Sequence, residues 1–200
     1  MKYSLNTAPI IEPLTLAEAK AHLNIPDVET YWDDYVTALI VSARESVEQI
    51  TYRGLLTQTW TLYLDSTEFT ELYERIVEIS KVPVQSISSI KYYNQSNTLT
   101  TLDASKYITD LQSINQPARI QFIDVPNVYV RMNAVEIRFV CGWTSAELLP
   151  MPIKQAMKLI IGHLYEHREA VTVGGSPAEL PMGAQYLLNP YSLNWFYRSV

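Results

Sequence analysis

The pattern of this 200-residue sequence changes from helical to strand-like and back to helical along the chain. Apolar side chains recur at helical spacing in residues 33–53 and again in residues 153–168. Residues 56–143, between them, form short runs rich in β-branched and aromatic residues. Neither helical segment is long enough to be stable alone, so each needs a partner for its apolar face. We therefore expect the two helical segments to pack together, with a β-module inserted between them.

The first helical zone contains two helix starts. Thr15 can cap a short helix that stops near His22, and Glu18 completes a capping box. A longer helix opens at Asp33, where carboxylates meet the positive helix end, and we expect Gly54 to end it. Three charged residues, Arg44, Glu45 and Glu48, lie off its apolar stripe. The stripe consists of Val36, Leu39, Ile40, Ala43, Val47 and Ile50.

The middle zone indicates a series of short strands separated by turns. The clearest cluster of turn residues is 94–97. The regular spacing of the strands predicts an antiparallel sheet or a small barrel. The expected strands are 57–64, 76–79, 82–84, 86–93, 99–102, 107–109, 119–122 and 135–140.

The last zone returns to helix after Pro150 and Pro152. Pro181 opens a final short helix, which Asn189 and Pro190 close. The fold class that follows is α+β: a helical bundle core with an inserted antiparallel β-module and an extended C-terminal arm. We expect residues 1–55 to form the first part of the core, 56–148 the β-module, 149–190 the helices that complete the core, and 191–200 the arm.

The charge of the chain limits the partners that it can hold. Its formal net charge is −6, its pI is about 5.1, and it has no run of Lys or Arg. Stable binding to DNA or to an anionic membrane is therefore not expected. No apolar run approaches the length of a membrane span, and the N-terminus has no signal-peptide pattern, so we expect assembly inside a cell. The single cysteine, Cys141, excludes an internal disulfide and is expected to be a small buried residue.

The sharpest chemical signal is His163-Leu164-Tyr165-Glu166-His167. Two His residues four apart on a helix share a face and can hold zinc, with Glu166 as a general base. The alternative is that both His residues lie on the packing side of an amphipathic helix. A third ligand is lacking, since Glu169 and Glu179 are the only acids that follow. We therefore predict neither a metal site nor any other cofactor site.

The C-terminal arm alternates polar and aromatic residues, and such apolar area is rarely left exposed on soluble monomers. Two arrangements remain open: the arm folds back on its own domain, or it fills a groove of a partner. We take the second as the hypothesis, with a partner protein or a neighbouring subunit as the acceptor of the arm. The residues concerned are Tyr191, Trp195, Phe196, Tyr197 and Arg198.

The order of these segments resembles the phage head–tail connector (adaptor) family of the HK97 gp6-like type. The resemblance spans roughly residues 10–190 and depends on order and spacing rather than on a single motif. It is carried by EPLTLAEAKAHL (12–23), the helix start at Asp33 and Asp34, EQITYRGLLTQTW (48–60), VPVQSI (82–87), PIKQA (152–156) and GHLYEHREAV (162–171).

The resemblance implies a structural virion protein and not an enzyme. Members form rings, here expected to have twelve subunits, that dock on the portal at the head–tail junction and meet a downstream neck or tail protein. DNA then passes through the channel without specific binding. The alternative function is that of a tail-completion or other neck assembly factor. A zinc-dependent hydrolase is the third hypothesis. As lateral contacts between subunits we take the charged helix sides, with Arg44, Glu45, Glu48, Arg168 and Glu169 as candidates.

Overall fold

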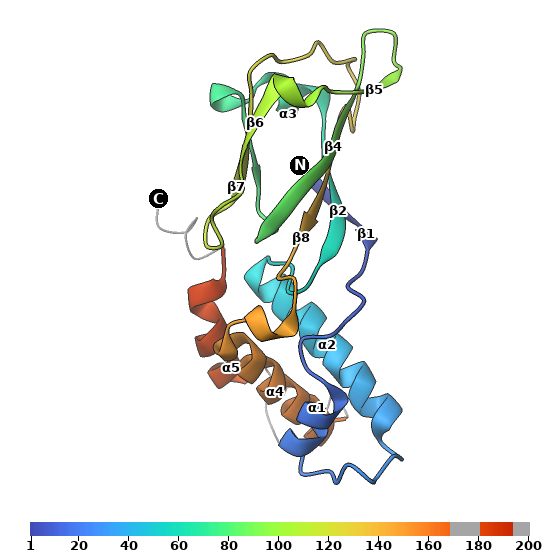
Figure 1. Ribbon diagram of the computed structural model, residues 1–200, viewed down its shortest axis with the longest axis vertical. Helices are drawn as coiled ribbons and strands as arrows, with labels where there is room; N and C mark the ends of the chain where they lie inside the picture. The colour runs from blue at the N-terminus through green and yellow to red at the C-terminus, as the bar shows by residue number, and fades with distance from the viewer. Residues whose placement is uncertain (169–180, 194–200) are drawn as a thin grey trace, which may run out of the picture. The chain divides into compact units, whose positions relative to one another are not determined.

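The computed structural model describes residues 1–168 and 181–193 (Figure 1). Its chain forms two compact units, each built from two stretches of sequence. Met1–Ile10 and Thr57–Gly142 make up the unit that we call the β-unit. Ile11–Leu56 and Trp143–Val200 make up the helical unit. Helices and antiparallel sheets together confirm the α+β class predicted from the sequence.

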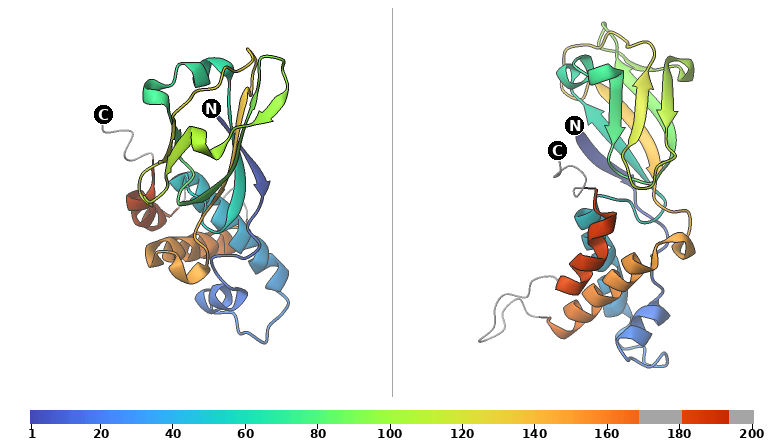
Figure 2. Two further views of the ribbon diagram at one scale, coloured as in Figure 1. Left: turned by 45° about the horizontal axis from the view of Figure 1, so that its top comes forward. Right: turned by 90° about the vertical axis from the view of Figure 1, so that its left-hand side faces the viewer.

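The β-unit contains two antiparallel sheets that face each other (Figures 1 and 2). The five-stranded sheet has the order β1 (Lys2–Thr7), β2 (Gln58–Leu64), β8 (Val135–Cys141), β4 (Val84–Tyr93) and β5 (Leu99–Thr101). The three-stranded sheet has the order β3 (Ile76–Ile79), β7 (Ala118–Phe122) and β6 (Tyr107–Asp110).

Alternating residues of both sheets fill the space between them, as period-two side-chain alternation requires. Leu62 pairs with Ile137 in register, and both are completely buried. On the second sheet Ile120 and Phe122 are buried too, and the Phe122 ring meets the Phe69 ring edge-on at 5.1 Å. Phe69 comes from α3 (Ser66–Thr70), a short helix that the sequence patterns did not indicate. Cys141 is buried in β8, as expected.

The first strand is the main difference from the fold expected from the sequence. Residues 1–55 were assigned to the helical core, but β1 pairs with β2 at the edge of the five-stranded sheet. Only Tyr3 of β1 is even half-buried. The sequence of the strand alternates just two apolar residues, Tyr3 and Leu5, with polar ones, so its signal for a strand is weak. The Tyr3 hydroxyl accepts a hydrogen bond from the Ser80 backbone N–H at 2.9 Å, and its ring meets Phe139 edge-on.

The helical unit consists of α1 (Leu16–His22), α2 (Asp33–Thr51), α4 (Met151–Glu166) and α5 (Met182–Leu188). Their apolar faces meet in one core, which confirms that the two distant helical segments pack together. The predicted stripe of α2 is buried apart from Ile50, which is partly exposed. In the described part of the chain, no helix has the length and apolarity that crossing a membrane requires.

The end of α2 differs from the expectation that Gly54 terminates it. The helix ends at Thr51, and Tyr52 takes the left-handed conformation with φ of 60°. The chain has therefore turned out of the helix two residues before the glycine. A tyrosine in this region of backbone space is uncommon, which is why the sequence favoured Gly54.

A buried lysine fixes the loop between α1 and α2. Lys20 is only 2% exposed, and its Nζ donates to the carbonyl oxygens of Asp27 and Glu29 at 3.1 and 2.6 Å. It also forms an ion pair with Asp33 at 2.7 Å. The three N–H groups of this buried ammonium each have an acceptor, so its burial leaves no donor unpaired. The hydrogen bonds to the backbone fix the conformation of the loop.

The predicted capping box at the start of α1 is present. The Glu18 N–H donates to Thr15 Oγ1 at 3.1 Å, and the Thr15 N–H donates to a Glu18 carboxylate oxygen at 2.8 Å. This hydrogen bond from the Thr15 backbone is the main reason why the pKa of Glu18 lies below its ordinary value.

Replacing Thr15→Val should therefore remove the cap and lower the free energy of unfolding by about 1 kcal/mol. The pKa of Glu18, followed by NMR titration, should rise only part of the way toward its ordinary value, because Thr15→Val removes the hydroxyl that donates to the carboxylate but keeps the backbone N–H. Because a carboxyl group with a depressed pKa stabilises the folded state only when ionised, the stability from the box should be lost as the pH falls through that pKa. A Glu18 pKa unchanged by the substitution would contradict this account of the cap.

Candidate assembly interfaces

Arg44 lies at the centre of a buried charged network in the helical unit. Its side chain comes from α2 and is only 6% exposed as a residue. Nε contacts both carboxylate oxygens of Glu12, at 2.9 and 3.2 Å, and Nη1 contacts Glu48 at 3.1 Å. The other oxygen of Glu48, which is 7% exposed, accepts the backbone N–H of Leu55 at 2.8 Å. The network therefore ties α2 to the chain segments before α1 and after α2.

This network changes the interpretation of two predicted contact residues. The sequence favours Arg44 and Glu48 as candidates for contacts between subunits because they lie off the apolar stripe, but both are buried and paired within their own chain. Glu12, which completes the network, was not singled out, because it lies 32 residues before Arg44 in the sequence. Burial raises the pKa of the Glu12 carboxyl above its ordinary value, and the adjacent Arg44 opposes that shift.

Glu45 is the residue of this group that remains available on the outside of α2. Its side chain is 61% exposed, and its contact with Arg44 is long, at 3.5 Å. Such an exposed pair contributes little to stability in water. Glu45 can therefore exchange this contact for one with a neighbouring molecule at low cost.

Arg168 follows α4 and lies over a cluster of aromatic rings. The centre of its guanidinium is 4.5 Å from the centroid of Trp32 and 5.0 Å from those of Tyr35 and Tyr165. The three rings also contact one another at 6.1 to 6.4 Å. Stacking on three ring faces engages Arg168 within its own subunit through cation–π attraction. Glu169, the other predicted contact residue of this segment, lies outside the described residues.

The His163-x-x-Glu166-His167 segment places its two imidazoles side by side. Their ring centroids are 4.8 Å apart, because residues four apart share a helix face. His163 is half-buried, whereas Glu166 and His167 are exposed at the end of α4, so His167 does not lie on the packing side. Within residues 1–168 and 181–193, no three His, Cys, Asp or Glu residues lie close enough together to hold a metal ion.

The base of the C-terminal arm is attached to the end of α2. The Ser192 hydroxyl donates to the Ile50 carbonyl at 3.1 Å, and the Leu193 N–H donates to the Thr51 carbonyl at 3.2 Å. The last carbonyls of a helix lack partners inside the helix, so these bonds satisfy groups that need them. Leu193 itself is 2% exposed. The arm therefore begins at a point fixed by its own subunit.

Arg53 reinforces this attachment, although sequence reasoning did not identify it. It is 1% exposed, and its Nε donates to the carbonyl oxygen of Tyr191. Burial lowers the pKa of Arg53 to about 10, so the guanidinium stays charged at neutral pH. Of the residues predicted to dock on a partner, only Tyr191 is described. Trp195, Phe196, Tyr197 and Arg198 lie outside the described residues.

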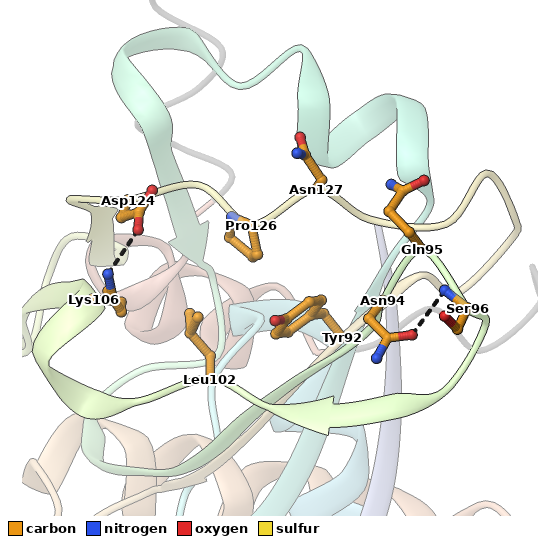
Figure 3. Close-up of a pocket in the computed structure, with 9 residues that line it drawn as sticks. All are labelled: Tyr92, Asn94, Gln95, Ser96, Leu102, Lys106, Asp124, Pro126 and Asn127. Atoms are coloured by element: carbon orange, nitrogen blue, oxygen red, sulfur yellow. Dashed lines mark hydrogen bonds and ion pairs between the residues drawn. The ribbon is translucent and has the colours of Figure 1, made fainter.

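The β-unit has a hollow of about 480 Å³ between the β4–β5 turn and residues 124–127 (Figure 3). Lys106 and Asp124 lie at one end and form an ion pair at 2.7 Å. At the other end, the Asn94 side chain accepts the backbone N–H groups of Ser96 and Thr98. These polar groups therefore hold the wall of the hollow together. Its lining contains neither His nor Cys, and it offers no paired nucleophile and base.

Replacing Arg44→Met should leave the half-buried Glu12 and the buried Glu48 without their cation. Removing one partner of a buried ion pair costs about 3–5 kcal/mol, so the free energy of unfolding in urea should fall by about that amount. Glu45→Gln is the matched control on the same helix and should change stability by less than about 0.5 kcal/mol. Equal effects of the two substitutions would show that the buried network does not support the unit.

Replacing Arg53→Met should leave the Tyr191 carbonyl without its donor and loosen the base of the arm. An unsatisfied buried acceptor costs about 1–3 kcal/mol. We expect trypsin or chymotrypsin to cleave the C-terminal segment faster in Arg53→Met than in the wild-type chain. Lys154→Met, a half-exposed cation of α4, is the control and should leave the cleavage rate unchanged. Unaltered cleavage in Arg53→Met would exclude this role for Arg53.

Comparison with known proteins supports the fold but does not show a family. No protein-family model matches the sequence, and no curated protein matches it. Among solved structures, a chain in the neck of an empty gene transfer agent (GTA) particle computed with C6 symmetry aligns with a TM-score of 0.76 at 20% identity. The alignment covers 96% of this chain and 95% of that chain.

Two further GTA structures give similar values. A chain of the native GTA virion aligns with a TM-score of 0.74, and a chain of the native neck computed with C12 symmetry aligns with 0.72. Each of the two chains is 20% identical in sequence to this chain. Each alignment covers 96% of this chain and 95% of the other chain. The fold of this chain is therefore that of chains found in these virion structures.

Proposed function

We propose that this chain is a head–tail connector, or adaptor, of a phage-like particle. The observation that carries the proposal is the alignment over 96% of the chain with a chain of a GTA neck. The alignment therefore includes both the β-unit and the helical unit, and it extends over nearly the whole of the neighbour's chain. The resemblance to connectors of the HK97 gp6-like type, which rests on separate sequence segments, supports the same role.

In this role, copies of the chain form a closed ring at the junction of head and tail. Necks computed with C6 and C12 symmetry are compatible with a ring of twelve subunits. A heterologous interface generates such a ring when its rotation closes. The ring docks on the portal on one side and meets a downstream neck or tail protein on the other. Its role is structural rather than catalytic, and the chain works as part of the virion.

The charge of the chain fits a wall past which DNA moves. The sequence of the helical unit holds 12 Asp and Glu residues against 7 Lys and Arg residues. Negative charge on the wall repels phosphates, so DNA passes without binding tightly. A monomeric tail-completion factor of the same neck is the alternative within the same class, and it differs by forming no ring.

The C-terminal arm is the docking element that we propose for the portal. Tyr191 lies at its attached base, and the aromatic residues Trp195, Phe196 and Tyr197 follow in sequence. Buried aromatic anchors are common in interfaces, and a ring repeats each anchor around its circumference. Glu45, which is exposed on α2, remains our candidate for a lateral contact.

Deleting residues 194–200 should abolish binding to the portal, because the aromatic anchors are lost. Leu193 stays in the shortened chain, since its side chain and backbone belong to the core of the helical unit. Circular dichroism and the denaturant midpoint should match those of the full chain. Co-sedimentation with purified portal rings measures docking, and normal binding by the shortened, folded chain would rule out the arm as the docking element.

A further inference from the structure

The helical unit has two outer edges, one formed by α2 and one by α5. Helix α4 packs against both, whereas α2 and α5 touch each other only briefly (Figure 1). The core side chains of α5, Ala184 and Leu188, are buried, and so is the apolar stripe of α2. The opposite faces of α2 and α5 therefore point away from α4.

The outer face of α5 carries two large side chains that nothing in the described structure covers. Met182 is 82% exposed, and Tyr186, one helical turn later, is 78% exposed. Residues four apart lie next to each other on a helix, so the two form one projecting ridge. The helix has no charged residue. An uncharged ridge with a large apolar side chain and an aromatic ring has the composition of an interface core.

The outer face of α2 carries small side chains, which complement the large side chains of the α5 ridge. Its exposed middle consists of Thr37, Ala38 and Ser42, all small and uncharged. The Ser42 hydroxyl donates to the Ala38 carbonyl at 2.9 Å, and the Ser46 hydroxyl donates to the Ser42 carbonyl at 2.8 Å. These hydroxyls already have acceptors on their own helix, so covering them leaves no donor unpaired. Asp34 and Glu45, both exposed, border this face along the helix.

We infer that the α5 ridge of one copy packs into the small-residue face of α2 on the next copy. The occupant is a second copy of this chain because one helical unit presents both halves of the contact, on its two opposite edges. Joining these edges continues the layer α2–α4–α5 from copy to copy. Such a contact is heterologous and closes into a ring when the rotation per copy allows it. The inference rests on the proposed ring and names the surface that builds it.

Engineered cysteines test this contact directly. The native Cys141 is buried, so it does not compete for oxidation under native conditions. We expect the double variant Ser42→Cys/Tyr186→Cys to form a ladder of cross-linked species on a non-reducing gel. A mixture of the two single variants should give heterodimers only. Homodimers formed by Tyr186→Cys alone would indicate contact between two α5 helices and would overturn the inference, as would the absence of cross-links from an assembled ring.

Association measured by sedimentation velocity provides the second test. Met182→Ser/Tyr186→Ser should weaken self-association at least tenfold, because the ridge is removed. Val28→Ser/Tyr31→Ser is the matched control: these residues, on the loop between α1 and α2, are 90% and 79% exposed but belong neither to the α5 ridge nor to the small-residue face of α2. The control should stay within twofold of the wild-type chain.

The two possible failures are distinguishable. Rings that assemble equally well with Met182→Ser/Tyr186→Ser would contradict this interface and leave the proposed function standing. A wild-type chain that stays monomeric at every concentration, alone and with portal rings, would contradict both the ring and the interface.

Discussion

The helical unit depends on the buried guanidinium of Arg44. An isolated charge at this depth would be strongly unfavourable, but Arg44 meets Glu12 and Glu48, and Glu48 in turn holds the Leu55 backbone. These contacts join α2 to two of the three places where the chain crosses between the units, before α1 and after α2. The end of α2 also holds Ser192 and Leu193. Helix α2 therefore fixes the start of the C-terminal arm as well as the chain segments that lead into and out of the β-unit.

This arrangement separates residues that maintain the subunit from residues that are available to partners. Arg44, Glu48, Arg53 and Arg168 have charges that could serve assembly, but each is engaged within its own subunit. The outer face of α5 and the exposed middle of α2 carry uncharged side chains. In the proposed ring, contacts through these faces depend on shape and apolar area rather than on ion pairs, so they are little weakened by salt.

Much of the fold could be predicted from the sequence because its signals are local. The Thr15–Glu18 capping box, the stripe of α2 and the β-rich runs of β2 and β8 each depend on neighbouring residues, and each is present. The errors have non-local causes. β1 is a polar edge strand whose partner lies more than 50 residues away, and the burial of Arg44 depends on Glu12, 32 residues earlier. The exposed ridge of Met182 and Tyr186 could not be distinguished from a buried one, because only the position of α4 shows which face is covered.

The central claim is that this chain forms a ring that seats on a portal. Electron microscopy of purified portal rings, mixed with the full chain and averaged along the ring axis, tests it most directly. The account predicts an additional ring at one end of the portal, continuous with its channel and with the same rotational symmetry. Portal particles that look the same with and without the chain, while the chain remains monomeric in solution, would contradict it.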